Sequence, residues 1–339
     1  MKHVFGTAVV VASLIALPAA AQTVTFKLAN FGPEGASTSR VFKAYVEEWK
    51  AKSQGRITLE LFHGATMGPM PRHYDLARTG VADFSFYQHG ATPGRFPLTE
   101  LTHMPYLWPD GAKGALVGAK AIGELYKDYL AREHTDTHNL YVVFNRPSGI
   151  WDGNKPIKAL ADLKNRRYRA PTTTDVAMFK ELGAVPIGVP ANGMAESLQK
   201  GTLDGVVTDA MGVFAFKLGD LVKHYTPMFT SAISFGVAMN KDAYMKLPAD
   251  LRAIIDYEST PARVAWMVET SWGKVPEVDK YLVDSKIDTV RLSAADDANM
   301  RKIADKIIDE RIKEVEAKNL PAREFYTKAK ALSAKYAKE

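Results

Sequence analysis

The sequence of 339 residues contains no cysteine. Without thiols there can be no disulfide bond, no zinc site built from thiolates, no cysteine nucleophile and no lipid-modified cysteine. The motifs His-Glu-x-x-His and Gly-x-Ser-x-Gly and a glycine-rich phosphate loop are also missing from the sequence. We therefore expect a protein with no catalytic residue, no metal ion and no cofactor.

An enzyme is the alternative, because the chain has eight histidines. Four of them, His63, His73, His89 and His103, fall in loop-like parts of the first third of the chain, which raises the hypothesis of a metal ion or a general base. Histidines scattered in this way are more often ordinary surface residues, so we favour a protein that performs no chemistry.

Long runs of one charge and long apolar runs are also absent. The formal net charge is +6, and the 44 basic and 38 acidic residues are mixed along the chain. Because no basic block or aromatic-basic module occurs, nucleic acid is not an expected partner. The apolar run 4–17 is too short to cross a bilayer, which takes about 20 apolar residues.

That apolar run belongs to an N-terminal segment typical of a secretory signal peptide. Lys2 and His3 precede it, and the small residues Ala19, Ala20 and Ala21 follow it. We predict that residues 1–21 are a cleaved signal peptide and that the mature protein is exported to the periplasm. The alternative is full secretion.

Strand and helix patterns alternate along the mature chain. Alternation of this kind is typical of an α/β protein in which helices pack on largely parallel sheets. The length favours two domains. The predicted strands are 24–30, 57–63, 82–88, 140–146, 185–189, 205–208 and 232–240, and the predicted helices are 37–53, 70–80, 113–132, 173–182, 192–200 and 211–224.

An unusually long helical pattern covers 248–284, interrupted only by Pro261 and Pro276. An unbroken helix of this length would measure about 55 Å, which is longer than a small domain is wide. We therefore expect a kinked helix that bridges both domains. Two more helices are predicted within 293–338.

The stretch 160–190 holds the strongest candidate for a binding site. It places Arg169 near the end of a predicted short strand, stops the strand at Pro171 and starts a helix through a capping cluster at 172–175. The partial positive charge of a helix start nearby favours an anion. The alternative role for Arg169 is a structural ion pair with an Asp or Glu side chain.

Five groups of residues, in this order along the chain, resemble a known family. They are Leu59-Glu60-Leu61-Phe62 with Gly64 and Met67-Gly68; Pro93-Gly94-Arg95-Phe96-Pro97-Leu98; Asp162-Leu163-Lys164 with Arg169; Ser197-Leu198-Gln199-Lys200-Gly201-Thr202-Leu203-Asp204-Gly205; and Met239-Asn240-Lys241 with Leu247-Pro248. The chain resembles the solute-binding subunits of tripartite ATP-independent periplasmic (TRAP) transporters, the family named after its C4-dicarboxylate binders. The resemblance extends over essentially the whole chain.

This resemblance implies a periplasmic binding protein fold with two α/β lobes, a ligand cleft between them and a long kinked helix spanning both. The implied lobes are 22–145 with 232–270, and 146–231 with 271–339. The implied function is to bind a small organic carboxylate through Arg169 and to deliver it to membrane-embedded permease subunits, with the receptor acting as a monomer. A sensor protein that docks on a receptor is the alternative within the same fold.

Other candidate ligand contacts follow from position in the chain. Arg146 ends a predicted strand in a crossover loop, and Trp151 follows it. Tyr87 and Gln88 end the strand 82–88, where alternation predicts that only one of them faces the ligand. Phe31 follows the first strand. Asp209 is a possible acceptor for a ligand hydroxyl, a counter-charge for Arg169, or a cap for the next helix. Phe235 adds a ring from the returning strand, or belongs to the core.

Overall fold

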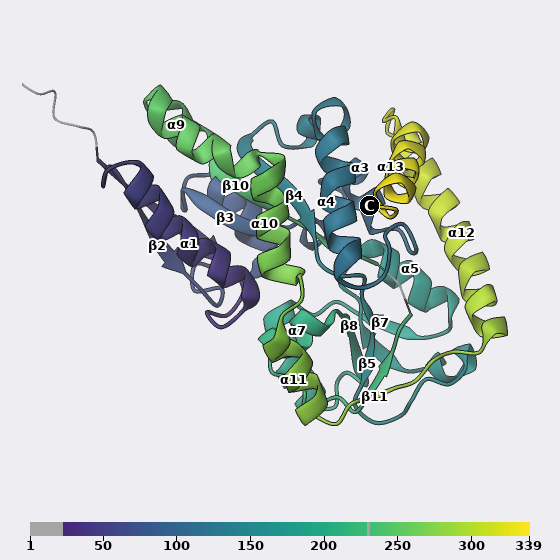
Figure 1. Ribbon diagram of the computed structural model, residues 1–339. Coiled ribbons are helices and arrows are strands. Elements are labelled where there is room, and N and C mark those ends of the chain that lie inside the picture. The colour runs from purple at the N-terminus through teal and green to yellow at the C-terminus, as the bar shows by residue number, and fades with distance from the viewer. Residues whose placement is uncertain (1–22, 229–230) are drawn as a thin grey trace, which may run out of the picture.

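The computed structural model describes residues 23–228 and 231–339, so the predicted signal peptide lies outside the described residues. Two separate β-sheets with helices packed around them form two lobes, one above the other in Figure 1. The predicted α/β class and two-lobed architecture are therefore confirmed. No helix within these two stretches is long and apolar enough to cross a membrane.

The first sheet has the strand order β2-β1-β3-β10-β4. Its strands are β1 (Val24–Asn30), β2 (Ile57–Phe62), β3 (Phe84–Gln88), β4 (Thr137–Phe144) and β10 (Ser234–Asn240). Strands β1, β2 and β3 are parallel, whereas β10 is antiparallel to both of its neighbours. Because β10 returns from the second lobe to lie between β3 and β4, this lobe is built from discontinuous segments.

The second sheet has the order β11-β9-β5-β8-β6-β7. Its strands are β5 (Gly149–Asp152), β6 (Arg167–Arg169), β7 (Val185–Ile187), β8 (Gly205–Thr208), β9 (His224–Thr226) and β11 (Asp288–Thr289). Strands β6, β7 and β8 are parallel, and β5 is antiparallel to both β8 and β9.

Three of these strands, β5, β9 and β11, differ from the sequence-based prediction, and β11 lies in a stretch for which the sequence predicts no element. β5 falls in a predicted loop, and β9 begins where the predicted helix 211–224 ends. Gly149 and its neighbour Pro147 favour a turn locally, but a Cβ atom at Gly149 would lie only 2.5 Å from the Tyr225 ring of β9. β5 therefore forms because its backbone lies close to β9, which is far away in the sequence, and local sequence patterns do not reveal such pairing.

The helices form where apolar side chains recur on one face. In α1, for example, Val41, Phe42, Tyr45 and Trp49 are all buried against the first lobe. The helices are α1 (Ser37–Lys52), α2 (His73–Arg78), α3 (Pro97–Glu100), α4 (Gly111–Leu125), α5 (Thr173–Glu181), α6 (Met194–Gln199), α7 (Ala210–Ala215), α8 (Lys241–Met245), α9 (Ala249–Asp256), α10 (Pro261–Trp272), α11 (Pro276–Asp284), α12 (Ala294–Glu316) and α13 (Ala322–Tyr336).

The long helical pattern 248–284 corresponds to α9, α10 and α11 rather than to one kinked helix. Pro261 and Pro276 each occupy the first turn of a helix, where proline is tolerated. Helix α10 packs on α1 and α4 of the first lobe, and α11 packs on α7 of the second. The segment therefore crosses between the lobes as predicted, but with breaks near Thr260 and Gly273.

Two crossings of the chain lie side by side between the lobes. The amide of Asn145 donates to the Ile233 carbonyl at 3.1 Å, and the Ser148 amide donates to the Ser231 carbonyl at 2.7 Å. The Asn145 carboxamide oxygen in turn accepts from the Ile233 amide at 2.6 Å. These contacts join the connection after β4 to the connection before β10.

Helix α13 returns from the second lobe to the first. Phe325 and Ala329 of α13 lie in one buried cluster with Ile122 and Leu125 of α4. Helix α12, by contrast, packs on α5 of the second lobe. The division of the chain into lobes stays a prediction, and these contacts lead us to propose that 322–336 be assigned to the first lobe instead of the second.

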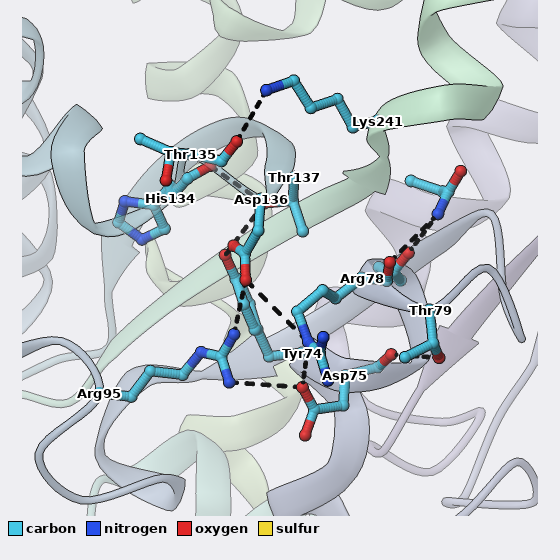
Figure 2. Close-up of polar contacts among 12 residues, drawn as sticks. Tyr74, Asp75, Arg78, Thr79, Arg95, His134, Thr135, Asp136, Thr137 and Lys241 are labelled. Carbon is cyan, nitrogen blue, oxygen red and sulfur yellow. Dashed lines mark hydrogen bonds and ion pairs between the residues drawn. The ribbon is translucent and has the colours of Figure 1, made fainter.

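A network of ion pairs and hydrogen bonds lies at the end of the first sheet where β4 begins (Figure 2). Arg95 pairs with Asp136 at 2.7 Å and with Asp75 at 3.4 Å, and its guanidinium lies 4.4 Å above the Tyr74 ring. Arg78 also pairs with Asp75, at 2.7 Å. β4 has eight residues and so spans about 26 Å. The network is thus remote from the other end of β4, where Asn145 follows.

Candidate ligand-binding cleft

A cleft lies between the two sheets, at the carboxyl ends of their parallel strands. This is where α/β sheets place ligands, because the connecting loops meet there. The space between its walls measures about 620 Å³, a figure that includes the open mouth. Residues from both lobes form its wall: Phe31, Thr38, Phe86, Gln88, Asn145, Arg169, Met194, Thr208, Asp209, Met211, Phe216, Phe235 and Trp272.

Arg169 reaches the cleft from the end of β6. Its Nε donates to the Val189 carbonyl at 3.1 Å and its Nη1 donates to the Val207 carbonyl at 2.9 Å. These two bonds fix the plane of the guanidinium. The remaining nitrogen, Nη2, has no hydrogen-bond partner within 23–228 and 231–339. A fixed guanidinium with a free N–H group is suited to bind a planar anion.

The positive charge of Arg169 is buried without a carboxylate in contact. The residue is only 2% exposed, and no Asp or Glu oxygen in the described part of the chain lies within 4.0 Å of it. Burial lowers the pKa of Arg169 to about 10, and the negative charge of Asp175 offsets this only in part. The group is still protonated at neutral pH, and an unpaired buried charge is costly. The structural ion pair considered for Arg169 is not found among the residues that the structure describes.

Aromatic rings form a nearly parallel series along one side of the cleft. Phe31 and Phe86 lie 5.1 Å apart with an angle of 10° between their planes, and Phe86 and Phe235 lie 5.4 Å apart at 19°. Phe235 and Trp272 follow at 5.5 Å and 20°. Such a wall favours a flat apolar body in the ligand.

Two amide side chains add hydrogen-bonding capacity. The Nε2 of Gln88 donates to the Pro171 carbonyl at 3.4 Å, a long bond that reaches from the first lobe to the second. The Oδ1 of Asn145 is used by the Ile233 amide, whereas its Nδ2 has no partner among the residues described. Both side chains lie in the cleft wall.

Asp209 follows β8 and forms part of the walls of both the cleft and an adjoining cavity. Its Oδ1 accepts from the Gly212 amide at 2.9 Å and so caps α7, as predicted. Its Oδ2 is buried and makes no hydrogen bond of good geometry in the described chain. Burial raises the pKa of Asp209 from 3.8 to about 6, although the Gly212 amide and the charge of Arg146 act in the opposite direction.

Tyr87, one of the predicted ligand contacts, does not lie in the cleft wall. Its hydroxyl donates to Asn139 Oδ1 at 2.8 Å, and its ring packs among Tyr74 and Phe96, outside the cleft wall. Gln88, the next residue, lies in the wall. This is the alternation expected of a strand, because neighbouring side chains point to opposite faces.

Arg146 and Trp151 also lie outside the cleft wall and line the adjoining cavity instead. The guanidinium of Arg146 donates to the carbonyls of Trp272, at 2.8 Å, and Gly273. These carbonyls end α10 and have no helical partners, so a cation is favourable there. Trp151 donates to the Thr208 carbonyl at 2.9 Å and stacks on Tyr225. Arg146 therefore ties two interlobe crossings together, and Trp151 supports the sheet.

The other predicted contacts, Phe31, Gln88, Arg169, Asp209 and Phe235, all lie in the cleft wall. That they touch a ligand stays a prediction. Sequence reasoning missed the rest of the wall, including Asn145, Met194, Met211 and Trp272. Asn145 carries a usable signal, since it is a polar residue at the end of an apolar strand. Trp272 carries none, because only the break between α10 and α11 brings it to the cleft.

Of the four histidines considered for a metal ion or a general base, His63 is partly buried and the other three are buried. His73, His89, His103 and His134 are buried rather than exposed, and burial lowers the pKa of each. The Nε2 atoms of His89 and His134 lie 3.1 Å apart in the interior of the first lobe. No group of three or more side chains that could hold a metal ion occurs in the described residues.

Comparison with known proteins gives a family match over most of the chain. The profile of the family described as bacterial extracellular solute-binding protein, family 7, matches residues 29–314. A curated relative named solute-binding protein, from Albidiferax ferrireducens, is 22% identical over 243 residues, which cover 69% of this chain and 71% of the relative.

Two solved structures are similar in both fold and sequence. A TRAP solute-binding protein from Rhodoferax ferrireducens, in complex with copurified benzoate, is 27% identical with a TM-score of 0.87, and the match covers 93% of this chain and 99% of the other. A TRAP solute-binding protein from a marine metagenome, described as specific for aromatic acid ligands and crystallised with 3-hydroxybenzoate, is 28% identical with the same TM-score and the same coverage.

Proposed function

The chain belongs to bacterial extracellular solute-binding protein family 7, and from this premise we propose that it binds a small aromatic carboxylate in the cleft. In this proposal the carboxylate pairs with Arg169, and the ring lies along the aromatic wall of Phe31, Phe86, Phe235 and Trp272. The ligand is then handed to membrane-embedded TRAP permease subunits without chemical change.

The observation that carries the proposal is the buried guanidinium of Arg169. It is held in place by two main-chain carbonyls, it has no carboxylate within 4.0 Å in the described residues, and it lies in the wall of a cleft. A ligand carboxylate would supply the missing negative charge through charge-assisted hydrogen bonds. The protein places this cation where it is poorly solvated, which is favourable only when an anion binds.

The aromatic part of the proposal has two supports. The wall of stacked rings matches a flat apolar body better than a flexible dicarboxylate, which would need a second cation. Arg146, the second cation considered from the sequence, instead bonds to the end of α10. The two similar structures above are described with benzoate and 3-hydroxybenzoate.

The remaining parts of the proposal concern location and partners. We place the mature receptor in the periplasm, in keeping with a family described as extracellular and with relatives named solute-binding proteins. We also propose that it acts as a monomer. A sensor of the same fold is the second candidate, and an enzyme the third. A sensor would not deliver its ligand to a permease, and an enzyme would change the ligand chemically.

A calorimetric titration tests the proposal directly. We expect saturable binding of benzoate or phenylacetate by the purified mature protein, and weaker or no binding of succinate and malate. Mass spectrometry of the ligand after incubation should show the unaltered acid. Tight binding of a dicarboxylate with no response to any aromatic acid would contradict the proposal that the ligand is aromatic. Recovery of a chemically altered ligand would support the enzyme as the function.

A further inference from the structure

Asp209 is the second unusual charge of the cleft. It is 5% exposed, and its Oδ2 makes no hydrogen bond of good geometry in the part of the chain that the structure describes, although the Arg146 main-chain amide lies near enough to favour the charged form. A buried acceptor without a partner destabilises a protein by about 1–3 kcal/mol, and more when it is charged. Capping α7 requires only one oxygen, Oδ1, so the cap does not explain why the chain has a carboxylate here.

The position of Asp209 relative to Arg169 limits what it can bind. β6 and β8 are neighbouring parallel strands, and Arg169 is in register with Val206, three residues before Asp209. The Arg169 guanidinium, however, reaches along the strand to the Val207 carbonyl, two residues before Asp209, and two residues of a strand span about 7 Å. No ion pair within 4.0 Å joins the two side chains. A ligand can therefore contact Arg169 with one end and Asp209 with the other.

The chemistry of an ionised carboxylate decides which group meets Asp209. It is an acceptor only, so its partner must donate a hydrogen bond, and a ligand carboxylate would be repelled. The cationic Arg146 already acts on Asp209. A second full cation from the ligand would be repelled by Arg146, whereas a neutral hydroxyl would not.

We infer that the ligand is a hydroxylated aromatic carboxylate and that Asp209 Oδ2 accepts a hydrogen bond from the ring hydroxyl. This inference rests on the proposed function, because it assumes that the carboxylate pairs with Arg169. Asp209 then selects among aromatic acids: an acid without the hydroxyl leaves Oδ2 unpaired in a closed cleft. Sites built to bond a substrate hydroxyl discriminate strongly against analogues that lack it.

Calorimetric titration with matched pairs of acids tests this inference. The probes are benzoate against 3-hydroxybenzoate and 4-hydroxybenzoate, and phenylacetate against 3-hydroxyphenylacetate. We expect at least one hydroxylated acid to bind about tenfold or more tightly than its parent, since one good hydrogen bond to a charged group is worth that much. In the variant Asp209→Ser, whose hydroxyl keeps the cap of α7, this preference should fall to within about twofold.

The control variant is Asp136→Ser, which removes an exposed carboxylate from the network in Figure 2 and should keep the wild-type preference. Binding of benzoate with no gain from any hydroxyl would overturn this inference and leave the proposed function intact. Tighter binding of 4-(aminomethyl)benzoate than of every hydroxylated acid would show that Asp209 selects an ammonium group instead. Failure of all these acids to bind would refute both proposals.

Discussion

Arg263 in the first lobe and Arg169 in the cleft are both buried arginines, with 8% and 2% of their surface exposed. Arg263 is 2.6 Å from a carboxylate oxygen of Glu258 and 2.8 Å from one of Glu48. Burial opposes its charge, but the hydrogen bond and charge of Glu258 and the charge of Glu48 outweigh burial and raise its pKa. Among the described residues, Arg169 has two carbonyl partners and no carboxylate in contact, and its pKa is lowered.

The difference separates a structural charge from a functional one. The charge of a structural arginine is neutralised by carboxylates of the same chain, so no bound anion is needed. Arg166 with Asp152, at 2.7 Å, follows the same rule in the second lobe. Arg169 is compensated only in part, and the missing anion has to come from outside. Removing the two side chains should therefore have opposite consequences for folding and for binding.

The largest effect on stability is expected from Arg263→Ala. The substitution leaves Glu258 buried and without its cationic partner, and breaking a buried ion pair in this way costs about 3–5 kcal/mol. Urea denaturation of the ligand-free protein measures this loss. The matched variant Arg169→Ala strands no carboxylate in contact, so it should lose less than half as much. Equal losses in the two variants would remove the distinction between the two arginines.

A second effect concerns pH and Asp209. The pKa of the Asp209 carboxyl is raised from 3.8 to about 6 in the folded protein, so protonation of Asp209 favours the folded state. The stabilisation from this protonation is fully present below about pH 4 and is lost as the pH rises through about 6. The rise in pKa corresponds to at most about 3 kcal/mol. The ligand-free Asp209→Ser variant has no carboxyl group at this position, so its stability lacks this dependence on pH.

Thermal denaturation from pH 4 to pH 8 measures that effect. The melting temperature of Asp209→Ser relative to the wild type should increase between about pH 4 and pH 6 and then level off. Taking the difference between the two proteins cancels the other titrating groups. A difference that stays constant across this range would mean that the carboxylate of Asp209 is solvated.

The smallest effect is expected from Arg95→Ala in the network of Figure 2. Arg95 and its partners Asp75 and Asp136 are about one-third to two-fifths exposed, and ion pairs at such positions contribute about 0–1 kcal/mol. Denaturation should show a loss within that range, and calorimetry should show unchanged affinity for the aromatic acid. A tenfold loss of affinity would mean that the network acts on the cleft.

Much of the fold could be predicted because its signals are local. β1 and α1 follow from apolar periodicity, whereas Pro261 and Pro276, which were expected to kink one long helix, each begin a separate helix. Strands β5 and β9 could not be predicted, since each is short and depends on partners far away in the sequence. The same limit applies to the cleft. Arg169 is marked by its strand end and by the family resemblance, whereas Trp272 and Arg146 take their places only through the crossings between lobes.

The central claim is that Arg169 holds the ligand carboxylate, and calorimetric titration of Arg169→Ala and Arg169→Lys tests it most directly. Both variants should fold, as circular dichroism can verify. Alanine should weaken binding of the aromatic acid by about 2–5 kcal/mol, roughly thirty- to several-thousand-fold. Lysine keeps the charge but loses the planar fork, so its affinity should lie between those of alanine and the wild type. Wild-type affinity in a folded Arg169→Ala protein would show that the carboxylate is held elsewhere.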